Sequence, residues 1–139
     1  MASNIIIQFN EILTSFLVQI IPIVGSTYHS NILTIIRFNS ALPIENFLYY
    51  AIECRDKIMN RDESYFRDKT IVTSNVVRND KLDEIFKLQN IYGFLDKSSK
   101  DNVWDIFQAL LILGEDYIKA KYSNKYQKNW IIPDKQTGL

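Results

Sequence analysis

The sequence has very few of the residue types from which catalytic and metal-binding sites are built. Its 139 residues include one cysteine, one histidine and four glycines. One thiol and one imidazole cannot supply the ligands of a zinc site. The glycines are scattered along the chain, so neither phosphate-binding pattern, G-x-x-x-x-G-K or G-x-G-x-x-G, can occur. The composition therefore predicts no metal, no cofactor and no small-molecule substrate, and we expect that the protein is not an enzyme.

The few residues that could carry acid–base or nucleophilic chemistry have simpler interpretations. The sole histidine, His29, lies in a predicted loop, and nothing in the sequence places a carboxylate beside it. Carboxylates such as Glu53 and Asp56 stand next to Arg or Lys, which favours permanent ionisation over a tuned proton donor. Cys54 lies beside the inner face of a predicted helix and is interpreted as a core residue. A single cysteine excludes an internal disulfide and, with no N-x-S/T sequon, suggests a reducing compartment.

The chain also lacks a net charge. Sixteen basic side chains balance sixteen acidic ones, which removes the general electrostatic argument for binding nucleic acid or an anionic membrane. Residues 1–36 carry one charge, Glu11. Apolar side chains recur there at the spacing of an amphipathic helix, and they are Ile5, Phe9, Ile12, Leu13, Phe16, Leu17 and Ile20.

This first predicted helix could be covered by the protein itself or by lipid. The apolar run from Ile12 to Val24 is shorter than the ~20 residues that a membrane span needs, and Gln19 and Pro22 interrupt it. No basic residue precedes Arg37, which argues against a secretory signal. We interpret residues 1–24 as mainly a core helix, with binding to a membrane surface as the alternative.

The most apolar stretch is predicted to be one long central helix, at about residues 99–121. Ser98 and Asp101 stand at capping-box spacing at its start. Apolar side chains follow almost all the way round, including Trp104 and Phe107, which are interpreted as core aromatics. Such a helix must be covered by neighbours on two or three sides. Only a narrow polar strip is expected to be solvated, through Asp105, Gln108, Glu115 and Asp116.

Three further helices are predicted from caps and periodicity. Ser30 can cap a short second helix, and Pro43 suits the first position of a third helix that runs to about Met59. Asp80 can cap a fourth helix. Between the third and fourth, three Arg-Asp dipeptides follow each other at six-residue spacing. We expect them to cap and pair locally around a turn near residue 60 and a short helix through Tyr65.

Together these elements predict an all-α fold. We expect a single-domain bundle of about five helices within residues 1–132, followed by a flexible C-terminal tail at residues 133–139. The β-branched segment 70–77 is expected to be an extended connection, not part of a sheet.

Two motifs resemble those of known proteins. The fragment KIMNRDESYF at residues 57–66 is followed by SSKDNVWDIFQALLILGE at residues 98–115. They are similar to motifs of small uncharacterised proteins encoded by large cytoplasmic DNA viruses of protists, although Ile106 and Phe107 reverse the expected aromatic–aliphatic order. The resemblance covers about a third of the chain and implies a viral origin, an all-α fold and residence in the host cytoplasm or the virion. It implies no catalytic activity.

The first functional hypothesis is a non-catalytic interaction or structural protein, such as a virion component or an adaptor. The chain is 47% hydrophobic, which is more than a small monomer easily buries. A protein partner or self-association is therefore expected. The candidate partner-binding residues are Phe9 and Phe16 on the first helix and an apolar group near the C-terminus, Trp130, Ile131 and Ile132.

The alternative hypothesis is a nucleic-acid-binding accessory factor that uses segment 117–128. Basic groups interleaved with aromatic rings can hold a single strand. Lysines near a helix end more often belong to a solvated terminus, where they are favourable to the helix dipole. The candidate residues are Lys119, Lys121, Tyr122, Lys125, Tyr126 and Lys128.

Overall fold

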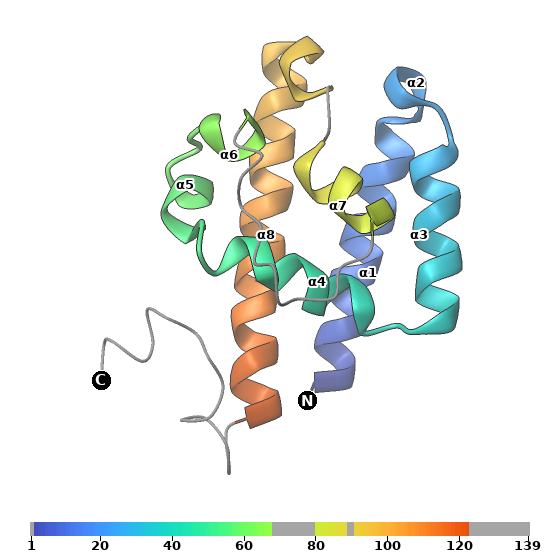
Figure 1. The fold of residues 1–139 in the computed structure, drawn as a ribbon, viewed down its shortest axis with the longest axis vertical. Helices are drawn as coiled ribbons and strands as arrows, with labels where there is room; N and C mark the ends of the chain where they lie inside the picture. The colour runs from blue at the N-terminus through green and yellow to red at the C-terminus, as the bar shows by residue number, and fades with distance from the viewer. Residues whose placement is uncertain (1, 68–79, 89–90, 123–139) are drawn as a thin grey trace.

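The computed structural model describes residues 2–67, 80–88 and 91–122, and in these ranges every regular element is helical (Figure 1). The all-α prediction is confirmed. The helices are α1 (Ala2–Gln19), α2 (Ile21–Val24), α3 (Thr27–Phe38), α4 (Leu42–Ala51), α5 (Arg55–Met59), α6 (Ser64–Arg67), α7 (Asp80–Lys87) and α8 (Lys97–Tyr122), with the 3-10 helix η1 (Tyr92–Phe94) before α8. Five of them have eight residues or more, and α2, α5 and α6 are single turns. The predicted extended segment 70–77 and tail 133–139 lie outside the described residues.

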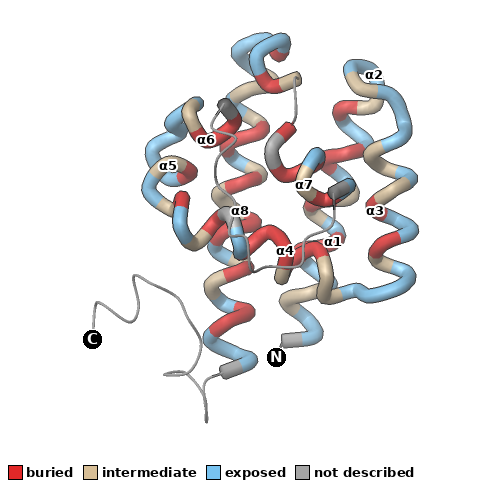
Figure 2. Tube along the Cα trace, viewed as in Figure 1, coloured by how far each residue is buried: buried red, intermediate tan, exposed pale blue. Residues whose placement is uncertain are grey.

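Helix α8 is the central element, as predicted. Helix α1 packs along it in the opposite direction, so the start of α1 lies near the end of α8 (Figure 1). Helix α3 covers the other side of α1, and α4 crosses and contacts both α1 and α8. Helix α7 packs on α3 and α4, while α5 packs on α8. The buried residues line the inner sides of these helices (Figure 2).

The core is built mainly from aromatic rings. Phe16 of α1 and Phe47 of α4 both contact Phe107 of α8, with ring centroids 6.3 and 5.9 Å apart. Phe47 also packs on Phe86 of α7 at 5.0 Å. These tilted and edge-to-face arrangements are the favoured geometries for aromatic pairs. The interpretation of Trp104 and Phe107 as core aromatics is confirmed, since both are buried.

The start of α8 differs from the prediction. The helix begins at Lys97, and its cap is Asp96, whose Oδ1 accepts a hydrogen bond from the Ser99 amide at 2.7 Å. The capping box proposed for Ser98 is therefore wrong. Asp101 instead pairs with Lys97 one turn earlier, at 3.3 Å. A carboxylate directly before the first turn satisfies the exposed amides and suits the helix dipole, which favours the earlier start.

The predicted third helix is broken in two. Helix α4 ends at Ala51 and α5 begins at Arg55, after a turn. The turn lets α5 lie against α8, where the Arg55 Nε atom donates to Glu115 at 2.6 Å. Arg61 similarly reaches Asp105 of α8, at 2.5 Å. The prediction that Arg55 and Arg61 pair locally is therefore wrong for these contacts.

Most of the polar strip of α8 that was predicted to be solvated contacts the segment around α5. Gln108 donates to the carbonyl groups of Ile58 and Met59, each at 3.2 Å. With Glu115 and Asp105 it binds the segment around α5 through polar contacts. The turn near residue 60 and the short helix through Tyr65 are confirmed.

The second helix begins earlier than predicted. Helix α3 starts at Thr27, so His29 lies in its first turn and not in a loop. Ser30 is inside the helix, where its carbonyl accepts a hydrogen bond from the Thr34 hydroxyl. The inner face of α3 is formed by Ile32 and Ile35, both buried.

Candidate functional site: an apolar groove between α1 and α3

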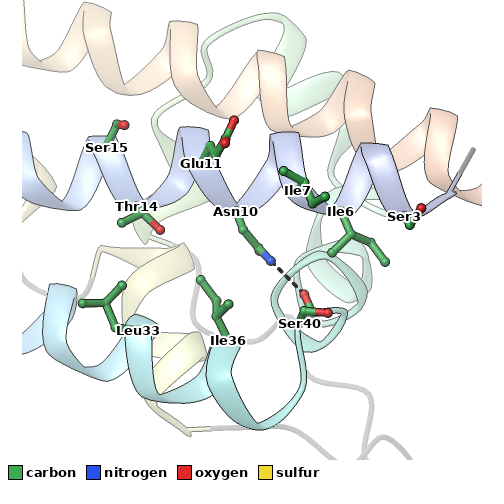
Figure 3. A pocket seen from close by; sticks show the side chains of 10 residues that line it. All are labelled: Ser3, Ile6, Ile7, Asn10, Glu11, Thr14, Ser15, Leu33, Ile36 and Ser40. Atoms are coloured by element: carbon green, nitrogen blue, oxygen red, sulfur yellow. Dashed lines mark hydrogen bonds between the residues drawn. The ribbon is translucent and has the colours of Figure 1, made fainter.

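A groove of about 590 Å³ runs between α1 and α3 (Figure 3). One wall is α1, from Ser3 to Ser15. The other wall is the second half of α3 with the loop after it, through Leu33, Ile36 and Ser40. The lining is mainly apolar, with small hydroxyl side chains between the larger ones.

The groove exists because α1 carries apolar side chains outside its buried face as well as on it. The face described above is buried against α8, α3 and α4. A second stripe on its outer side consists of Ile7, Glu11, Thr14 and Val18, at spacings of four, three and four residues. These spacings keep the four residues on one line along a helix. Ile7 is 55% exposed and Val18 47%, so the two apolar side chains of this stripe are largely uncovered.

Helix α3 supplies the opposite wall by the same periodicity. Leu33 and Ile36 lie three residues apart on the side of α3 that lines the groove, and Arg37 lies one turn after Leu33. Leu33 is 41% exposed and Ile36 is partly buried. The groove therefore presents large apolar side chains from both helices to solvent.

A buried polar anchor fixes the two walls. Asn10 of α1 is only 8% exposed, and its Nδ2 group donates to the Ser40 carbonyl at 2.9 Å (Figure 3). This bond holds the loop after α3 against α1. The Asn10 Oδ1 atom has no hydrogen-bond partner among the described residues. An unpaired buried acceptor costs about 1–3 kcal/mol, so the anchor positions the groove at some cost in stability.

Charge is nearly absent around the groove. In residues 1–44 the charged side chains are Glu11 on α1 and Arg37 on α3. Both are exposed, and neither makes an ion pair with another described residue. The groove is thus a mainly apolar surface with one acid in its lining, Glu11, while the base Arg37 directly follows the lining residue Ile36 on α3.

The predicted partner-binding residues do not form this site. Phe9 and Phe16 are fully buried in the core, so their assignment to a partner-binding surface is wrong. Their large rings complete the α1 face that packs on α4 and α8. The other three candidates, Trp130, Ile131 and Ile132, lie outside the described residues. The groove residues were missed because the sequence was interpreted as one apolar stripe on α1. The exposed pair Ile7 and Val18, eleven residues apart, was the pattern that could have indicated a second one.

Of the predicted nucleic-acid-binding residues, Lys119 is exposed near the end of α8, and Tyr122 ends that helix. Lys125, Tyr126 and Lys128 lie outside the described residues. Lys121 is already engaged within the fold. Its ammonium group donates to Glu45 of α4 at 2.9 Å and to the Tyr117 hydroxyl at 3.2 Å.

The cluster of Glu45, Tyr117 and Lys121 ties α4 to the end of α8. The Tyr117 hydroxyl donates to Glu45 at 2.5 Å. Burial, together with the hydrogen bond to Glu45, raises the pKa of Tyr117 to about 12. The hydrogen bond to Glu45 also raises the pKa of Lys121 above its ordinary value. Tyr117 is therefore neutral and Lys121 charged at neutral pH, as a stable polar clamp requires.

A second hollow, of about 360 Å³, lies beside the start of α8. Its aromatic floor is Tyr92 and Trp104, which are 5% and 3% exposed. The Trp104 Nε1 group donates to the Tyr92 hydroxyl at 2.8 Å, and this hydroxyl lies 3.3 Å from Glu63. Burial raises the pKa of Tyr92. The rings are too deeply buried to stack on a base, so we interpret this cluster as structural.

Comparisons with known proteins add no assignment: no family model, curated protein or solved structure matches the chain. Within residues 2–67, 80–88 and 91–122, no helix is both long enough and apolar enough to cross a membrane.

Proposed function

We propose that this is a non-catalytic interaction or structural protein that binds another protein through the groove between α1 and α3. The observation that carries the proposal is the mainly apolar lining of the groove, in which Ile7 of α1 is 55% exposed and Leu33 of α3 is 41% exposed. Contiguous apolar surface of this kind is typical of protein-binding sites.

Helix-in-groove recognition suits this surface. An amphipathic helix lays its apolar face into a hydrophobic groove and is held by side chains spaced along it. Ile7 and Leu33 would provide the apolar contacts, while Ser3, Thr14 and Ser15 are small enough to let a helix approach closely. On the basis of the motif resemblance, we further propose a viral origin and residence in the host cytoplasm or the virion.

The nucleic-acid alternative has weaker support. Lys121 forms an ion pair with Glu45, and a phosphate would have to compete with that pair. Among the described residues, Lys119 is the other candidate lysine, and one lysine is a small fraction of the contacts that a single-strand site uses. We therefore retain the interaction proposal as the favoured function.

Position-specific photo-crosslinking tests the proposed function. A photoreactive amino acid is placed at Leu33, and in a matched variant at Ile112, an apolar residue of α8 that is 51% exposed. We expect discrete adducts from the Leu33 probe, in purified protein or in a lysate of the native cells, and few from the Ile112 probe. Substitution of Thr14 by Tyr, which fills the groove, should abolish the Leu33 adducts. Equal labelling by both probes, or adducts that persist after Thr14→Tyr, would rule out the groove as the binding surface.

A further inference from the structure

We propose that the occupant of the groove is a second copy of this chain, in a symmetric dimer where α1 of each copy lies on α3 of the other. This inference rests on the proposed function, because it names the partner of the same groove. The symmetry axis runs parallel to the groove. Each residue of α1 then faces the α3 residue that stands level with it on the second copy.

The shape of the groove is complementary to itself in this arrangement. Figure 3 shows Leu33 level with Ser15 across the groove, and Ile7 level with Ser40. Under the proposed symmetry, Leu33 and Ile7 of each copy therefore meet the small hydroxyl residues Ser15 and Ser40 of the other. Large side chains opposite small ones allow the helices to interdigitate. Because α1 and α3 run in opposite directions, the four helices form an antiparallel bundle, a common packing arrangement.

The charges are complementary in the same arrangement. Glu11 stands level with Ile36 (Figure 3), and Arg37 follows Ile36 by one residue, a rise of about 1.5 Å. The symmetry brings Glu11 of each copy to Arg37 of the other, which forms two equivalent ion pairs. Residues 1–44 hold no other acid or base apart from His29. Two copies can therefore meet on this face without a like-charge contact, as a closed interface that uses the same patch twice requires.

The contact length limits the strength of the dimer. The 12 residues of α3 span only about 18 Å, so the interface belongs to the small class that forms weak complexes. We expect a dimer that dissociates on dilution.

Charge reversal at Glu11 and Arg37 tests this dimer. The molar mass of the full-length chain is measured by analytical ultracentrifugation over a dilution series. Glu11→Arg leaves two bases on the face and Arg37→Glu leaves two acids. Each variant alone should raise the dimer dissociation constant by about tenfold or more, because like charges then face each other. An equimolar mixture of the two should restore a dimer of one copy of each. The matched control Asp116→Arg, at an exposed site on α8, should associate as the original chain does.

Since Glu11 and Arg37 are exposed, both variants should keep the unfolding transition of the original chain, which separates lost association from lost folding. A monomer at every concentration overturns this inference. The groove as a protein-binding surface would survive that result if the Leu33 probe still gives a discrete adduct with a different protein. A dimer that neither reversal weakens overturns the proposed interface, and so does a mixture that remains monomeric.

Discussion

At the scale of single residues, Arg61 combines an unfavourable backbone with a favourable side-chain contact. Its φ of 55° lies in the left-handed region. It follows the last residues of α5, where the Asp62 amide donates to the Lys57 carbonyl and the Arg61 amide to that of Ile58. This is the Schellman pattern of a helix end, in which glycine is usual. The guanidinium group compensates by binding Asp105.

This conflict gives a prediction for two substitutions of Arg61. Both Arg61→Ala and Arg61→Gly lose the ion pair with Asp105, which is largely exposed and contributes up to about 1 kcal/mol. Only glycine also removes the backbone strain. We expect the Gly variant to have a free energy of unfolding about 1 kcal/mol above that of the Ala variant, measured by urea denaturation. An Ala variant as stable as the Gly variant would show that the left-handed conformation costs nothing here.

Gly114 shows a second close approach at the residue scale. It lies in the middle of α8, where a glycine lowers helix stability by about 1 kcal/mol relative to alanine. A Cβ atom at this position would lie 2.7 Å from Cδ2 of the buried Leu48 on α4. The glycine therefore allows α4 to cross α8 at short range. The apolar periodicity of α8 in the sequence does not identify the helix that crosses there.

At the scale of elements, the cap of α8 gives a pH-dependent prediction. Hydrogen bonds from the backbone and side chain of Ser99 hold the pKa of Asp96 below its ordinary value of 3.8. The cap therefore stabilises the fold fully above that value, and its contribution is lost as the pH falls through the lower pKa of the folded state. Asp96→Ala should lower the midpoint of urea unfolding at neutral pH, and the difference from the original chain should shrink below pH 3.8.

Ser98→Ala is the matched control, because Ser98 was the cap predicted from the sequence and the structure gives the cap to Asp96. It should leave the unfolding midpoint unchanged at both pH values. A larger effect of Ser98→Ala than of Asp96→Ala would restore the capping box that the structure contradicts.

Helical periodicity predicted most of the elements correctly, because each long helix carries one strongly apolar face. It placed the buried side of α1, including Phe9, Leu13 and Phe16, and the core aromatics Trp104 and Phe107 of α8. Helix ends and the break before α5 were mispredicted because they depend on contacts that are distant in the sequence. The Arg55–Glu115 pair joins residues 60 positions apart, and no local pattern encodes it. The groove also depends on contacts that are distant in the sequence, since Leu33 lines it only because α3 packs beside α1.

At the scale of the whole molecule, α1 is required both for the core and for the proposed interface. Its inner side chains Phe9, Leu13 and Phe16 are completely buried, while Ile7 and Val18 remain exposed on the outer side. This arrangement confirms the interpretation of α1 as a core helix. A binding helix that merely docks on a finished domain would leave its apolar face uncovered in the monomer. Helix α1 instead provides the surface on which α3, α4 and α8 pack.

Deletion of residues 1–24 should therefore unfold the protein and not simply release a monomer. Removing several fully buried large side chains costs far more than the 5–15 kcal/mol by which a domain is typically stable. We expect loss of the cooperative thermal transition in circular dichroism, with much of the helical signal. Deletion of residues 133–139, the predicted tail, is the control and should leave the transition unchanged. A deletion variant lacking residues 1–24 that remains a cooperatively folded monomer would mean that α1 docks on an independent domain, and its buried face would then have to be reconsidered as a binding surface.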